Sequence, residues 1–232
     1  MTVAAARAAL RAAADPEKAR VLQGFFKTGP GQYGEGDRFL GINVPALRKF
    51  AREFQSLSLA DVTGLLQGSW HEERVLALFI LVRQYERGDE KTRDAIYRLY
   101  LASTDRINNW DLVDGSAPYI VGPHLRERSR APLYKLAKSK SLWERRIAIL
   151  ATFHFIKHND YDDAIRIAEI LLHDDHDLIH KAAGWMLREI GNRDRAVEEA
   201  FLRKHAAHMP RTMLRYAIEK FPEALRTRYL QR

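Results

Sequence analysis

The sequence of 232 residues predicts an all-α fold, built as a solenoid of helix pairs with a concave basic groove. Apolar residues recur three or four positions apart through most of the chain, as on one face of a helix. No segment alternates between apolar and polar residues as a half-buried strand would. In addition, one short motif of basic and apolar residues returns at a nearly constant interval.

The recurring motif defines the period of the predicted solenoid. Arg146, Lys181 and Arg215 each lie in such a motif and are separated by steps of 35 and 34 residues. Arg74 precedes Arg146 by 72 residues, and Trp110 lies in the middle of that interval. A period of this length in an all-helical pattern is typical of HEAT-like repeats, whose second helices line the concave side of the array.

We expect one domain over residues 1–232, because a chain of this length can bury a substantial core. Within it, residues 1–44 should hold N-terminal helices and a glycine-rich loop. Residues 45–232 should hold the helix-pair repeats.

The first elements follow from local patterns. Residues 3–26 should form two helices, the second capped by Asp15 and beginning at Pro16, because aspartate suits the N-cap and proline the first helical position. Four glycines and a proline between residues 27 and 37 predict an exposed loop.

The remaining helices follow from apolar spacing and from caps. A helix is expected from Pro45 to Phe54, and a shorter one over residues 59–66. Partner helices of the repeats are expected over residues 89–101 and 161–172. Another helix should begin near Asn109, because two asparagines in succession favour an N-cap.

Composition limits the possible chemistry. The 38 Lys and Arg residues exceed the 30 Asp and Glu residues, and the net charge of +8 favours a polyanionic partner. The absence of cysteine excludes disulfides, thiolate zinc sites and cysteine nucleophiles. No run of about eighteen apolar residues occurs, so we expect no membrane span. Arg7 and Arg11 interrupt the N-terminal segment, which therefore does not resemble a signal peptide.

The repeat geometry predicts a row of cations along the groove. The residues at the recurring position, together with two tryptophans, are Arg74, Trp110, Arg146, Lys181, Trp185 and Arg215. A basic groove with indole rings suits a nucleic acid duplex. The alternative is that each cation is solvated or pairs with Glu72, Glu73 or Glu144.

The segment from Asn108 to Asp114 is the best candidate for chemistry. Trp110 and Asp114 are four residues apart, so a helix would present the indole and the carboxylate on one face. If the repeats bring Trp185 and Arg146 to the same place, a carboxylate between two indoles would stabilise a sugar that loses a cationic base. The alternative is a buried tryptophan that holds two helices together, with Asp114 in a cap or an ion pair.

The sequence does not predict a metal site. His173, His176 and His180 lie close together among aspartates, but they span a loop between helices. Their spacing matches no familiar zinc motif. We expect neither a metal nor a cofactor.

Four segments resemble a known family. They read NNWDLVD (Asn108 to Asp114), ERRIAI (Glu144 to Ile149), HKAAGWMLRE (His180 to Glu189) and FLGI with Pro45. The first three in this order are specific, and the four together resemble the AlkD-like DNA glycosylases of DNA alkylation repair, a family of HEAT-like repeat proteins. The resemblance covers nearly the whole chain.

The resemblance implies an enzyme that hydrolyses the N-glycosidic bond of cationic alkylated purines, such as 3-methyladenine, 7-methylguanine and bulkier adducts. It would do so without base flipping and would leave an abasic site. The partner would be double-stranded DNA, and the enzyme a cytoplasmic, nucleoid-associated monomer. By position the resemblance implies Asp114, Trp110 and Trp185 for catalysis, Arg146 (and not Arg145) as the family arginine, and Phe25 beside the lesion. The predicted basic groove adds further candidate DNA contacts, which are Arg145, Lys181, Arg188, Arg74 and Arg215.

Two departures from the family pattern leave a second function open. Phe25 stands where the best-known member has a tyrosine, and the loop over residues 28–37 is longer. The alternative function is a non-catalytic HEAT-like module that binds distorted or branched duplex DNA. A scaffold for protein partners would instead need an acidic or apolar groove, which the row of cations argues against.

Overall fold

A computed structural model describes residues 1–231, and over that range the chain is all-helical without a strand. The predicted fold class is therefore confirmed at the level of secondary structure. The HEAT-like solenoid and its basic groove stay predictions. The chain forms two compact units, Met1–Ser116 and Ala117–Arg232. The single-domain organisation also stays a prediction.

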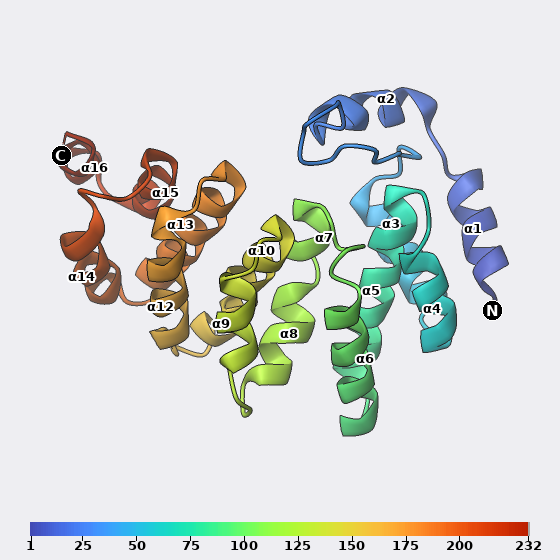
Figure 1. The fold of residues 1–232 in the computed structure, drawn as a ribbon. Helices are drawn as coiled ribbons and strands as arrows, with labels where there is room; N and C mark the ends of the chain where they lie inside the picture. Colours follow the sequence, from blue (N-terminus) through green and yellow to red (C-terminus); the bar gives the residue numbers. More distant parts are fainter. Residues whose placement is uncertain (232) are drawn as a thin grey trace. The chain divides into compact units, whose positions relative to one another are not determined.

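The N-terminal unit is built around one long helix, α5 (Figure 1). Helices α3, α4, α6 and α7 all pack against α5, and α1 packs against both α4 and α5. The helices of this unit are α1 (Val3–Ala12), α2 (Pro16–Phe25), α3 (Val44–Glu53), α4 (Leu59–Leu66), α5 (His71–Arg87), α6 (Glu90–Ala102) and α7 (Trp110–Asp114).

Side-chain caps explain where these helices begin. The carboxylate of Asp15 accepts hydrogen bonds from the amides of Glu17 and Lys18, and Pro16 opens α2 as predicted. Helix α3 begins at Val44, one residue before the proline that was expected to open it, because Asn43 supplies the cap. Each cap satisfies an amide that has no partner within the helix.

The C-terminal unit is built around α13 (Asp177–Gly191), which packs against several other helices of the unit. Its neighbours include α10, α12, α14 and α15. The other elements are α8 (Ala117–Leu125), α9 (Ala131–Ala137), α10 (Leu142–Ala151), α11 (Phe153–Ile156), α12 (Asp162–Ile170), α14 (Arg195–His205), α15 (Arg211–Ala217) and α16 (Glu223–Leu230), with 3-10 turns at Leu171–His173 and Ile218–Lys220.

The helices are too short or too polar to span a bilayer. Over residues 1–231, none combines the length and the apolar character needed to cross a membrane.

The segment between α2 and α3 is fixed by hydrogen bonds that its backbone amides donate. The carboxylate of Glu72, buried at the start of α5, accepts hydrogen bonds from the amides of Leu40 (2.8 Å), Gly41 (2.8 Å) and Ile42 (3.2 Å). Gly41 has φ of 87°, and a Cβ at this position would lie 2.1 Å from the carbonyl oxygen of Asp15. Only glycine therefore allows this segment to pass so close beneath the start of α2.

We expect Gly41→Ala to destabilise the protein by about 2 kcal/mol or more, because alanine adds backbone strain and a collision with Asp15. Urea unfolding followed by circular dichroism measures the loss. Gly24→Ala is the matched control. Gly24 lies in α2 with open space around its Cβ position, and alanine favours helices, so this variant should be no less stable than wild type. Equal stability of the two variants would contradict the prediction.

Candidate functional site

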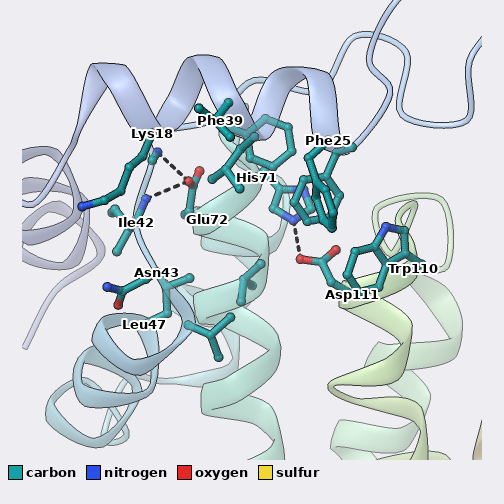
Figure 2. A pocket seen from close by; sticks show the side chains of 16 residues that line it. Lys18, Phe25, Phe39, Ile42, Asn43, Leu47, His71, Glu72, Trp110 and Asp111 are labelled. Carbon is teal, nitrogen blue, oxygen red and sulfur yellow. Dashed lines mark hydrogen bonds and ion pairs between the residues drawn. The ribbon is translucent and has the colours of Figure 1, made fainter.

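A pocket of about 430 Å³ lies in the N-terminal unit, between α2, α3, α5 and α7. Figure 2 shows α2 above the pocket and Trp110 and Asp111 at one end of it. Its wall is mainly apolar, and the polar side chains that line it are those of Lys18, Asn43, His71, Glu72 and Asp111. Pockets of this size and character commonly bind small molecules or parts of larger ligands.

Aromatic rings form the wall beside Trp110. The ring of Phe26 stacks on the indole with centroids 5.2 Å apart, and Phe25 meets the indole edge-on at 6.0 Å. Phe26 is buried, whereas Phe25 is 62% exposed. Because Phe26 covers one face of the indole, the other face is the one that a ligand could contact.

A buried histidine connects this wall to the glycine-rich loop. His71, the first residue of α5, binds Asp37 through Nδ1 (3.1 Å) and Asp111 through Nε2 (2.8 Å). The imidazole also packs against Phe26 and Phe39, with ring centroids 5.1 and 4.5 Å away. It therefore joins the loop, α5 and α7 at one point.

The carboxylate of Asp37 has three hydrogen-bond partners, and all three residues are buried. One of its oxygens accepts a bond from the guanidinium of Arg74, and the other accepts bonds from His71 and from Asn109 Nδ2 (3.0 Å). The side-chain oxygen Oδ1 of Asn109 in turn accepts a hydrogen bond from the backbone amide of Trp110 at 2.8 Å. Asn109 is thus the predicted N-cap of α7, and it carries a second bond that the cap pattern does not indicate.

The charges in this network set its pKa values. Burial lowers the pKa of His71, but the charge of Asp111 and the hydrogen bonds to both aspartates outweigh burial and raise it to about 9. Burial likewise opposes ionisation of Asp37, yet the bond to His71 and the charge of Arg74 lower its pKa to about 2. At neutral pH, imidazolium and guanidinium therefore face two carboxylates, and both ring nitrogens donate.

Asp114 is the last residue of α7 and is half-buried. Burial raises the pKa of the neighbouring Tyr100, and the charge of Asp114 raises it further. The Tyr100 hydroxyl and the Ser116 hydroxyl lie 2.9 Å apart, and Ser116 donates to the Leu112 carbonyl. Polar groups of α6 and of the turn after α7 thus surround the base of this short helix.

The predicted site residues of the C-terminal unit are distributed over three helices, α10, α13 and α15. Arg146 in α10 is buried, and its guanidinium donates to the Leu178 carbonyl. Trp185 in α13 is half-buried and donates from Nε1 to Glu189 at 3.2 Å, beside Phe153. That these two residues join Trp110 and Asp114 in one site stays a prediction.

The other predicted DNA contacts differ in their exposure. Three of these cations have acidic partners, and these are not the glutamates that the sequence suggested: Arg145 binds Asp174, Lys181 binds Asp177, and Arg188 binds Glu219. The side chain of Arg215, in contrast, is exposed on α15.

Arg74 has a role that the sequence did not indicate. It is only 3% exposed, and its guanidinium binds Asp37. The two glutamates expected as its partners bind elsewhere, Glu72 to backbone amides and Glu73 to Arg7. This geometry places Arg74 in the interior network, because the helix turns its side chain inward. Its contact with DNA stays a prediction.

Two histidines of the segment from His173 to His180 have protein partners, and these are His176 and His180. Asp174 binds Arg145, and its carbonyl oxygen contacts His180 Nε2. His176 caps α13 through Nδ1, which accepts the amide of Leu178. No group of three or more His, Asp or Glu residues within residues 1–231 is arranged to hold a metal ion.

Sequence reasoning missed the residues at the centre of the site. The sequence patterns do not indicate His71, Asp37, Phe26 or Asp111 as site residues. One indication was available, because the histidine and the following Glu72, Glu73 and Arg74 directly precede the apolar run over residues 75–82 of the same helix. Polar residues in such a helix must find partners inside the protein.

Comparison with known proteins identifies the family. The family described as DNA alkylation repair enzyme matches residues 6–221, and the chain belongs to this family. A solved structure described as "Predicted DNA alkylation repair enzyme from Enterococcus faecalis" is similar, with a TM-score of 0.70 and 16% identity over 90% of this chain and 97% of that one. At this identity the likeness concerns the fold alone. No curated protein matches the sequence significantly.

The raised pKa of His71 predicts how stability depends on pH. Its contribution is fully present below pH 6.5, the ordinary value, and is lost as pH rises through about 9. We expect the unfolding free energy of the wild type to fall by roughly 3 kcal/mol across that window because of His71 alone.

Urea unfolding at several pH values measures this change. His71→Gln should lose most of this pH dependence of the unfolding free energy. His208→Gln, which alters an exposed histidine of the other unit, should keep the pH dependence of the wild type. Identical profiles for the two variants would show that His71 is not the group responsible.

Proposed function

We propose that the protein is a monofunctional DNA glycosylase that removes cationic N3- and N7-alkylated purines from double-stranded DNA. One observation carries the proposal. In a member of the DNA alkylation repair enzyme family, a half-buried tryptophan and an aspartate lie one turn apart on the short helix α7, with the tryptophan in the wall of a pocket.

The proposed reaction is hydrolysis of the bond between C1′ of the deoxyribose and the purine nitrogen. The bonding electron pair leaves with the base, which becomes neutral, and the sugar becomes an oxocarbenium ion. The carboxylate of Asp114 stabilises this cation and orients the water that attacks C1′. The water then loses a proton, and an abasic site remains. A base that is already cationic needs no general acid to leave.

The indole of Trp110 supports the same transition state. Its π face attracts a positive charge, and the sugar carries that charge as the bond breaks. Phe26 covers one indole face, so we assign the sugar to the other face. Phe25, exposed and edge-on to the same indole, is proposed as the neighbour of the lesion. Within the C-terminal unit, Trp185 is proposed as a further catalytic indole and Arg146 as a contact to a backbone phosphate.

DNA binding is proposed to depend on the basic residues of the C-terminal unit. The net charge of +8 favours a polyanion, and Arg215 is the most exposed of the predicted contacts. Arginine suits this task because its planar guanidinium can bind two phosphate oxygens at once. Arg145, Lys181 and Arg188 would have to exchange or share their acidic partners to contact a phosphate.

Asp114→Asn should reduce the release of 7-methylguanine from alkylated duplex DNA by at least about a hundredfold, because the neutral amide no longer stabilises the cation. Duplex affinity should change little. Free base measured by liquid chromatography and affinity measured by fluorescence anisotropy separate the two effects. Asp61→Asn, on α4, is the control and should behave as wild type.

Two outcomes would contradict this assignment. Unchanged release by Asp114→Asn would remove Asp114 from the mechanism. A wild-type protein that binds alkylated duplex but frees no methylpurine would instead favour the non-catalytic DNA-binding module.

Arg215→Gln should weaken binding to duplexes of every sequence. It should also reduce the slope of log affinity against log salt concentration by about one. Binding titrations at several salt concentrations measure both. Arg98→Gln removes a cation that is also exposed, on α6 of the other unit, and should leave the salt dependence unchanged. If both variants lose affinity equally, only net charge matters and the proposed contact is wrong.

A further inference from the structure

The helix that carries Trp110 is too short to be stable by itself. Helix α7 contains five residues, about one turn and a half, and an isolated helix of this length is unstable in water. Its direction must therefore be set by contacts with the rest of the N-terminal unit. The residues before and after Trp110 supply those contacts.

Both of these residues are connected to Asp37. Asn109, which caps the helix, donates to Asp37 Oδ2 at 3.0 Å. Asp111 binds His71 at 2.8 Å, and His71 binds the same Asp37 oxygen at 3.1 Å. Asp111 also accepts the amide of Leu112 with its other oxygen. The first turn of α7 is thus held on both sides of Trp110.

The aromatic rings give a second path between His71 and the indole. Phe26 stacks on Trp110 and on Phe39 at 5.2 and 4.9 Å, and it contacts the imidazole at 5.1 Å. The imidazole therefore supports the ring that covers one face of Trp110. Movement of His71 would disturb both the hydrogen-bonded path and this stack.

We propose that His71 is a positioning residue, which fixes the indole of Trp110 by binding Asp37 of the loop and Asp111 of α7 at the same time. The effect on base release rests on the proposed function. The effect on the geometry of Trp110 does not, because it concerns only the N-terminal unit.

The charges around His71 indicate when this restraint operates. Asp37 from the loop and Asp111 from α7 bind the imidazole directly, and Arg74 from the same helix reaches it through Asp37. Glu72 from α5 and Lys18 from α2 line the same pocket. When the imidazolium loses its proton, one of its two nitrogens can no longer donate, so one carboxylate loses its bond.

Fluorine NMR of protein labelled with 5-fluorotryptophan tests the proposal without any DNA. The chain has four tryptophans, and the resonance of Trp110 is the one that Trp110→Phe removes. In the wild type this resonance should shift with a midpoint near the His71 pKa of about 9. The resonance of Trp185, in the other unit, serves as the internal control.

Three variants locate the origin of the shift. His71→Gln should abolish the midpoint, and Asp111→Asn should move it to lower pH, because imidazolium loses its partner carboxylate. Glu198→Gln is the matched control. Burial raises the pKa of Glu198 to about 8, so this group titrates in a neighbouring range but lies in the other unit. Its removal should leave the Trp110 midpoint unchanged.

Base release provides a second readout at neutral pH. His71→Gln should slow the single-turnover release of 7-methylguanine on the order of tenfold, with duplex affinity retained, because displacement of a reacting surface affects the chemical step more than binding. Circular dichroism verifies that each variant is folded.

Each outcome has a defined meaning. A Trp110 resonance that does not shift in folded wild-type protein overturns the proposal, even if both His71→Gln and Asp111→Asn fail to fold. A midpoint that survives in folded His71→Gln also overturns it. A wild type that releases no base contradicts the proposed glycosylase, while the NMR result still tests the positioning role.

Discussion

The N-terminal unit depends on the burial of paired charges beside an aromatic wall. Asp37 and Asp111 face His71 and Arg74, so two negative and two positive groups share one interior site. An unpaired charge in such surroundings costs several kcal/mol, whereas a paired and hydrogen-bonded one is tolerated. The loop, α5 and α7 must therefore meet in this arrangement for all four groups to be satisfied.

Local patterns predicted most of the helices. Asp15 caps α2 as predicted, because a cap involves residues only two or three positions apart. Helices α4 and α6, capped by Ser58 and Asp89, begin within one residue of their predicted starts. The central network could not be found in this way. His71 is 34 residues from Asp37 and 40 from Asp111, and no periodicity relates residues at such separations unless the fold is known.

The candidate site shows the same division. The sequence identified Trp110 from the pattern around it, yet it gave no reason to prefer Phe26 over Phe25. These neighbours differ by about 100° around a helix, so one is buried on the indole while the other is exposed. Similarly, the repeat period placed Arg74 and Arg146 near equivalent helix positions. It could not predict that both are buried, because side-chain direction depends on what packs against each helix.

The carboxylate of Glu72 accepts hydrogen bonds from the main-chain amides of three successive residues, and this affects how the sequence of the segment can vary. Main-chain bonds do not depend on side-chain identity, so Leu40 and Ile42 could be exchanged for other apolar residues without loosening the segment. The position of the segment instead depends on one carboxylate, that of Glu72, and on one glycine, Gly41. Evolutionary drift in this stretch should therefore be uneven, permissive in the residues that fill space and strict at the two positions that define the path of the chain.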